Sequence, residues 1–346
     1  MSDAAPPQSA AASSLAAYGN LKLYDLQKPF VEPMLQLCRL TNTALDALFY
    51  DVGALATTLL AQGIDINTGA SCDDGTSPRP PKTIDLSAAT HPSGSIVIVD
   101  AKLRGLISDW FLDMEPFINH ANNAGRDTLH TLAVTGVGSS AYGAVAFAWD
   151  VSKAIGEPVA AVVPGYGLAD VVPQALGGWF GFEIYDALQS ATQNWLASFA
   201  PTLAMMGKEL ALSTPGRDPA ATGAPVYRYG SAASDDVHAI LKAVPTITRL
   251  VGHSKGALAI ENALRSLATS HAEGISVFTL GCVIEEEFPK NRYQQSLGWL
   301  DALGTLNSLG KLTSGGRAPE RPTLADHSTN SLFPLSMQVG PCVAAR

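Results

Sequence analysis

The sequence predicts an α/β protein built on a mostly parallel, doubly wound sheet with helices on both faces. Two observations carry this prediction. Short apolar runs typical of buried strands alternate with segments of helical periodicity. A Gly-x-Ser-x-Gly sequence, Gly252 to Gly256, stands where a strand would turn sharply into a helix. The chain has 346 residues, of which 47% are hydrophobic, and this is sufficient for one large domain with an extensive core.

Composition divides the chain into three parts. Residues 1–20, rich in Ala, Ser and Pro, are expected to be a flexible N-terminus. Residues 21–90 form an N-terminal helical segment and a loop, because leucines recur at helical spacing up to residue 61 before Gly, Asp and Pro take over. Residues 91–346 are the expected catalytic domain. The apolar N-terminal helices are expected to pack on their own core or, alternatively, to form a homodimer interface.

The catalytic part contains five predicted strands, two predicted helices ahead of the glycine-flanked serine, and a third predicted helix, Ala257–Arg265, directly after it. Short apolar strands separated by helices favour a parallel sheet that is covered on both faces. The strands are expected at Ile96–Asp100, Thr131–Thr135, Val159–Val163, 246–251 and Ile275–Leu280, and the helices at Asp109–Ala124, broken at Pro116, and at Ala141–Ile155.

The connection between Val163 and Thr246 is much longer than a single crossover helix requires. An insertion at about 168–230 is therefore expected, with a helix and several aromatic residues. Such an insertion above the carboxyl ends of the strands is expected to act as a lid or as the wall of an apolar acyl pocket. The alternative is a helical subdomain whose aromatic residues fill ordinary core.

Ser254 is the candidate nucleophile. Its hydroxyl is a weak nucleophile and needs a base oriented by an acid. In proteins with this kind of turn the chain order is serine, acid, histidine, and only His271 and His327 follow Ser254. His327, in a loop near the carboxyl terminus, is the preferred base, whereas His271 is expected at the far end of the sheet. His253 is expected to pack the turn.

Asp301 is the preferred acid because its position between Ser254 and His327 leaves room for a strand and a loop. The alternatives are three consecutive glutamates that follow a predicted strand: Glu285, Glu286 and Glu287. Asp326 is too close in sequence to reach the far ring nitrogen of the histidine.

The oxyanion hole is expected to use two backbone N–H groups. One belongs to Lys255, directly after the nucleophile, and the other to Val137 or Gly138 in the glycine-containing loop after the strand at 131–135. A nucleotide-binding loop is the weaker interpretation of this segment, because the glycines have the wrong register for Gly-x-Gly-x-x-Gly and no Lys follows as in a P-loop.

These residues together resemble the α/β-hydrolase superfamily, and Val251 to Ala259 is similar to the corresponding turn of the class 3 lipase group. The resemblance covers roughly residues 90–337. It implies acyl transfer by a Ser-Asp-His triad through a covalent acyl-enzyme, with water as the usual acceptor. Two departures are Lys255, where that group often has an uncharged residue, and the N-terminal helical segment.

The net charge of −9 and the absence of Lys/Arg runs argue against a nucleic-acid partner. Four singly placed cysteines lack metal-site spacing and are expected to be buried thiols, with a Cys72–Cys342 disulfide as the less favoured alternative. Neither a cofactor nor a metal is expected. The first residues lack a secretory signal and no apolar run is long enough to cross a bilayer, which predicts a soluble, cytoplasmic protein.

The expected activity is therefore carboxylic ester hydrolysis, with a small-molecule, lipid or polyester ester carrying an apolar acyl group as the substrate. Two alternatives stay open. An acyltransferase would use the same triad with an alcohol or thiol in place of water. A non-catalytic protein that binds a lipid or polyester surface would retain the triad without using it.

Overall fold

The computed structural model describes nine stretches of the chain. They are residues 46–64, 94–123, 129–136, 139–164, 232–265, 267–286, 288–308, 319–321 and 324–344. The predicted flexible N-terminus, most of the predicted N-terminal helical segment and the whole insertion at about 168–230 lie outside these residues.

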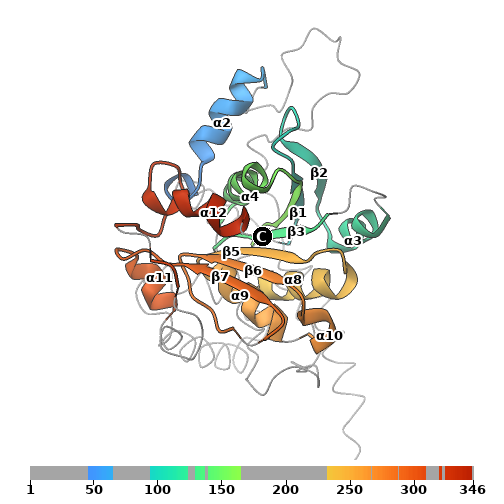
Figure 1. Ribbon diagram of the computed structural model, residues 1–346. Helices are drawn as coiled ribbons and strands as arrows, with labels where there is room; N and C mark the ends of the chain where they lie inside the picture. Colours follow the sequence, from blue (N-terminus) through green and yellow to red (C-terminus); the bar gives the residue numbers. More distant parts are fainter. Residues whose placement is uncertain are drawn as a thin grey trace, which may run out of the picture.

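Seven strands form one sheet in the order β2-β1-β4-β3-β5-β6-β7 (Figure 1). The five strands from β4 to β7 are mutually parallel, while β1 is antiparallel to both β4 and β2. The strands are β1 (Ile96–Val99), β2 (Ile107–Phe111), β3 (Thr131–Val134), β4 (Val159–Val162), β5 (Arg249–His253), β6 (Ser276–Leu280) and β7 (Arg292–Ser296).

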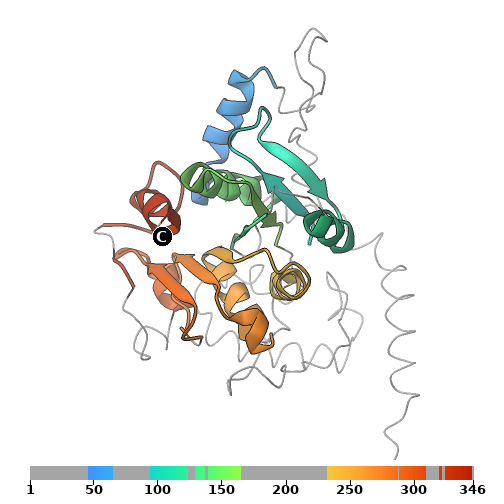
Figure 2. The ribbon, with the colours of Figure 1, turned by 45° about the vertical axis from the view of Figure 1, so that its right-hand side comes forward.

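Helices cover both faces of this sheet. On one face lie α2 (Val52–Ala61), α4 (Ala141–Ile155) and α12 (Val339–Ala344); on the other lie α3 (Met114–Asn123), α8 (Ala232–Ala243), α9 (Lys255–Arg265) and α10 (Thr269–Ala272). Figure 2 shows the two helical layers separated by the sheet. Two further short helices, α11 (Ala302–Asn307) and the 3-10 helix η3 (Pro334–Gln338), belong to the connections after β7. The predicted α/β class with a mostly parallel, doubly covered sheet is confirmed.

The strand sequences explain the two cores. Val97 faces the α4 side and its neighbours Ile96 and Ile98 face the α9 side, because successive side chains of a strand point to opposite faces. All four residues of β1, β3 and β4 are buried, as expected for strands covered on both faces. Helix α4 is buried at twelve positions, because α2 and α12 pack against it in addition to the sheet.

Two expectations from the sequence are wrong. Asp109 to Phe111 belong to the edge strand β2 and not to a helix, which begins only at Met114. Pro116 lies in the first turn of α3, where no intrahelical donor is needed, so it does not break the helix. The strand β7 was not predicted, because its sequence Arg-Tyr-Gln-Gln-Ser lacks an apolar pattern.

Two smaller findings complete the description. Cys342 is a free, buried thiol, so the alternative disulfide with Cys72 is not formed, and burial raises its pKa to about 12. Within the described stretches no helix is long and apolar enough to cross a membrane.

Candidate functional site

Ser254 is the only residue between the end of β5 at His253 and the start of α9 at Lys255. Its backbone has a φ of 54°, in the left-handed region that non-glycine residues rarely adopt, and its N–H donates to the carbonyl of Leu280 at 2.9 Å. This turn reverses the chain from strand to helix at the carboxyl edge of the parallel strands. The Ser254 side chain is therefore presented above the sheet.

The two glycines that flank this serine are required by close packing. A Cβ atom at Gly256 would lie 2.2 Å from the carbonyl oxygen of Val134 in β3. A Cβ atom at Gly252 would lie 2.7 Å from Cα of Ala257 in α9. Both neighbours are backbone atoms that cannot move aside, so only glycine permits α9 to pack this closely on β3 and β5.

Three predicted residues come together at this edge of the sheet. The Oγ of Ser254 lies 2.8 Å from Nε2 of His327, and Nδ1 of His327 lies 2.8 Å from Oδ1 of Asp301. An ionised carboxylate can only accept hydrogen bonds, so Nδ1 of His327 carries the proton that it donates to Asp301. Nε2 is then unprotonated and accepts the hydrogen bond from the Ser254 hydroxyl. This tautomer is the one a general base requires.

Asp301 is 1% exposed and lies directly before α11, where its Oδ1 also accepts the N–H of Gly304. The competing acids are engaged elsewhere. Glu285 pairs with Arg265, and Glu286 accepts the side-chain amide of Gln295 at 3.2 Å. Glu287 lies outside the described residues.

The remaining competitors point away from Ser254 and His327. Asp326 accepts the N–H of Ser328 at 3.2 Å. His271 lies in α10, a helix separate from α9, which ends at Arg265. Among the described residues, Asp301 is thus the carboxylate bonded to the His327 ring.

Only part of the predicted oxyanion hole lies within the described residues. Lys255 is the first residue of α9 and directly follows Ser254, so its N–H lies in the first turn of this helix. Val137 and Gly138 lie outside the described residues. Gly136, just before them, is close to the nucleophile, since a Cβ atom there would be 3.4 Å from Cβ of Ser254. The loop after β3 therefore reaches the nucleophile, as expected.

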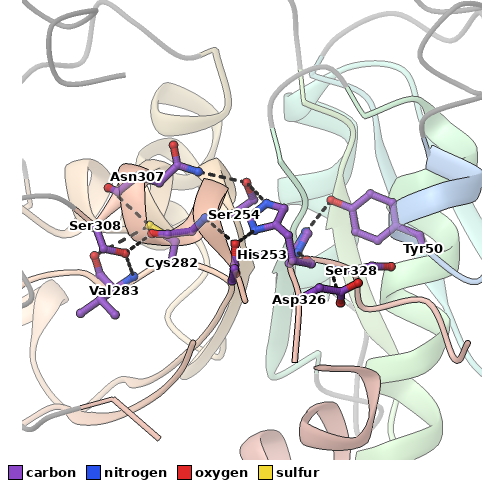
Figure 3. A network of polar contacts seen from close by, with 12 residues as sticks. Tyr50, His253, Ser254, Cys282, Val283, Asn307, Ser308, Asp326 and Ser328 are labelled. Carbon is purple, nitrogen blue, oxygen red and sulfur yellow. Dashed lines mark hydrogen bonds and ion pairs between the residues drawn. The ribbon is translucent and has the colours of Figure 1, made fainter. Parts of the chain in front are cut away.

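Tyr50 and His253 form a polar network beside Ser254 that the sequence did not predict (Figure 3). The Oη of Tyr50 lies 2.8 Å from Nδ1 of His253, and Nε2 of His253 lies 2.8 Å from the backbone carbonyl of His327. His253 is 1% exposed, in agreement with its expected packing role. Burial, and secondly the nearby His327, lowers the pKa of His253 to about 3, so this ring stays neutral at physiological pH.

Asn307, the last residue of α11, is a third residue that the sequence did not predict. Its Nδ2 lies 3.4 Å from Oγ of Ser254, on the side of the nucleophile away from Tyr50 (Figure 3). Its Oδ1 is buried without a hydrogen-bond partner in the described part of the protein. No motif or spacing marks this residue, and no sequence signal would have found it.

The described stretches contain no group of three or more His, Cys, Asp or Glu residues able to hold a metal ion. The chemistry that these side chains can perform is proton transfer between a serine hydroxyl and a buried imidazole, oriented by a carboxylate. No family model matches the chain. Comparisons with curated proteins and with solved structures also find no match.

Proposed function

We propose that this protein is a serine hydrolase that cleaves carboxylic esters with Ser254 as nucleophile, His327 as base and Asp301 as the orienting acid. The observation that carries the proposal is the pair of 2.8 Å contacts that joins these three side chains. Such pairs of contacts define a nucleophile, its base and the group that orients the base. The strained φ of Ser254 supports the same assignment, because unusual backbone geometry concentrates at active sites.

The proposed fold family is that of the α/β-hydrolases. In that family the nucleophile sits on a strained turn from strand to helix at the top of the sheet, with the acid and the histidine following in chain order. Ser254, Asp301 and His327 follow this order, and the sheet has its one oppositely directed strand, β1, next to one edge.

The proposed reaction proceeds in two steps. Ser254 Oγ attacks the ester carbonyl carbon while Nε2 of His327 takes its proton, and this proton then passes to the leaving alcohol, which leaves an acyl-enzyme. Water attacks the acyl-enzyme in the second step, with His327 again as base, and releases the acid and the free serine. The N–H of Lys255 supplies one donor to the tetrahedral oxyanion in both steps.

The proposed substrate carries an apolar acyl group. Apolar side chains are exposed on the two loops that carry Asp301 and His327: Trp299 and Leu300 precede the acid, and Leu324 precedes the base. These loops lie together, because the N–H of Leu300 donates to the carbonyl of Ala325 at 3.0 Å. Large exposed apolar side chains beside a reactive centre favour contact with a hydrophobic substrate.

The nucleophile assignment is tested with Ser254→Ala. This variant should lower the turnover of p-nitrophenyl acyl esters by about three orders of magnitude or more and abolish labelling by a fluorophosphonate probe. Asp301→Asn should lower kcat by a similar amount, because the amide favours the wrong tautomer of His327. His271→Ala, which removes the other histidine that follows Ser254 in the sequence, is the matched control and should retain activity. Wild-type turnover by Ser254→Ala would refute the proposal.

A further inference from the structure

Residues 46–51, here called the clamp segment, lie between the two loops that serve the nucleophile. On one side the segment contacts the loop that runs from β3 to α4. On the other side it contacts residues 328–331, directly after His327. The partners are distant in sequence, since the segment precedes the β3 loop by roughly 90 residues and the His327 loop by 280.

The first anchor is Asp46, which is 3% exposed. Its Oδ1 accepts the hydroxyl of Ser139 at 2.8 Å, and its Oδ2 accepts the N–H of Ser140 at 2.7 Å, just ahead of α4. Gly143 makes room for this carboxyl, because a Cβ atom there would lie 2.5 Å from Cγ of Asp46. Asp46 thus fixes the far end of the loop from β3 to α4.

The second anchor is Tyr50, which fixes the near end of the same loop. The N–H of Gly136 donates to Tyr50 Oη at 3.0 Å, so the hydroxyl proton of Tyr50 is directed to Nδ1 of His253 at 2.8 Å. His253 then carries its proton on Nε2 and donates it to the carbonyl of His327. This chain of donors joins the β3 loop to the backbone of the base.

The remaining contacts hold the loop of His327 against the clamp segment. The hydroxyl of Ser328 donates to the carbonyl of Leu48 at 2.7 Å, and the N–H of Thr329 donates to the carbonyl of Phe49 at 3.0 Å. The side-chain amide of Asn330 donates to two further carbonyls of the segment. The ring of Phe49 packs edge-on against the ring of His327, with 5.7 Å between ring centres.

We propose that the clamp segment is part of the active site and that Tyr50 is a positioning residue, which sets the loop after β3 and the His327 base in one fixed relation to Ser254. This inference rests on the proposed hydrolase function. Efficient catalysis requires both loops to be positioned to within about 0.5 Å of the productive geometry, and each loop is held by the same six residues. The described ends of the loop after β3, at Gly136 and at Ser139 and Ser140, are therefore tied to the loop of the base through one segment.

The charge state of the network suits this role. Burial raises the pKa of the Tyr50 hydroxyl, so the hydroxyl stays protonated as a donor. His253 lies 5.0 Å from His327, between ring centres, and a charge on it would oppose the imidazolium that forms during catalysis. The neutral His253 holds the backbone of the base without that repulsion.

The decisive variant is Tyr50→Phe. It keeps the ring contacts of Tyr50 with Phe147 and His253 and removes only the hydroxyl. We expect kcat for p-nitrophenyl esters and the rate of fluorophosphonate labelling of Ser254 to fall about tenfold or more, with KM nearly unchanged, because the loss is one of alignment. Tyr293→Phe, which removes the same hydroxyl from a buried position in β7, is the control and should react like the wild type.

The outcomes separate this inference from the proposed function. If the wild type is labelled and Tyr50→Phe is labelled equally fast, the role of Tyr50 is overturned and the proposed hydrolase function stands. A wild-type protein that is not labelled overturns both. Should Tyr50→Phe not fold, Asp46→Asn tests the other anchor: slower labelling supports the clamp, and an unchanged rate overturns it. Ring-nitrogen NMR of labelled histidine provides a readout independent of activity. In Tyr50→Phe the resonance of His253 Nδ1 should shift to that of an imidazole nitrogen that accepts no hydrogen bond, while Nε2–H, which donates to the His327 carbonyl, is retained.

Discussion

Asn307 contacts the proposed nucleophile Ser254 directly, although it is neither the proposed base nor the proposed acid. The Ser254 hydroxyl donates its hydrogen bond to His327, so the lone pairs of Oγ are left to accept the Nδ2–H of Asn307 at 3.4 Å. This bond is long and contributes little to the resting hydroxyl. We expect an amide donor at this position also to contact an oxygen of a bound ester, as side-chain amides do in some oxyanion holes.

Asn307→Ala should therefore lower kcat for ester hydrolysis by about tenfold, less than the loss for a well-aligned oxyanion donor. Asn307→Asp is the matched variant, since it keeps the shape of the side chain but replaces the donor with a carboxylate oxygen facing Oγ. It should be at least as slow as Asn307→Ala. Steady-state kinetics with one p-nitrophenyl ester is sufficient, and wild-type kcat for Asn307→Asp would show that the amide is not used as a donor.

The residues of the site differ in how far the sequence predicts them. Ser254, Asp301 and His327 follow from a glycine-flanked turn and from chain order, and the structure brings them into contact. Tyr50 and Asn307 do not follow from any pattern. The contact of Tyr50 with His253 spans 203 positions, and its function depends on which side of a folded loop the hydroxyl reaches. Such contacts are a consequence of tertiary packing, which local sequence does not encode.

At the scale of elements, the turn from β5 to α9 depends on Gly256. Gly256→Ala places a methyl group against the carbonyls of Val134 and Thr135 and must push α9 away from β3. We expect the free energy of unfolding to fall by about 2 kcal/mol or more, together with esterase activity, because Ser254 and Lys255 occupy the same turn.

The matched control is Gly53→Ala in α2, where a Cβ atom would meet nothing within 4 Å. This substitution should be neutral or stabilise by up to about 1 kcal/mol, because Ala is favoured over Gly inside a helix. Urea unfolding of both variants measures the difference. Equal midpoints for Gly256→Ala and the wild type would contradict the packing argument.

The strands show why part of the sheet was predicted and part was not. Val159 to Val162 is apolar throughout because both faces of β4 are covered, and such runs are recognisable. β7 has the polar residue Gln295 in its buried part, and its amide is satisfied by Thr279, Ile284 and Glu286. A polar strand of this kind is stable only because its partners are in place, so its sequence alone does not identify it.

For the whole molecule, buried titratable groups set the dependence of stability on pH. Burial raises the pKa of Asp46 to about 6 and that of Asp150 to about 7. The folded protein therefore holds protons that the unfolded chain has already released, and each carboxyl lowers stability as pH rises from about 4 to its folded pKa. His253 acts in the opposite direction, because its lowered pKa makes stability rise between about pH 3 and 6.5. The two effects oppose each other in weak acid.

Above about pH 6.5 the increase in stability from His253 is complete. Of the three groups, Asp150 has the highest folded pKa and still titrates in this range. Its carboxyl is paired with Lys153 at 2.6 Å, yet burial outweighs this pairing, and its Oδ2 has no hydrogen-bond partner in the described residues. Asp150→Asn should therefore gain stability relative to the wild type as pH rises from about 5 to about 8, with a slope of at most about 1.4 kcal/mol per pH unit.

Urea unfolding at these two pH values provides the measurement. Asp113→Asn removes the same charge from an exposed position and corrects for the change in net charge. If the stability difference between Asp150→Asn and the wild type is the same at both pH values after this correction, Lys153 fully compensates the burial of the carboxyl. In that case Asp150 behaves as an ordinary ion-paired carboxylate, and its titration does not change the free energy of unfolding between these pH values.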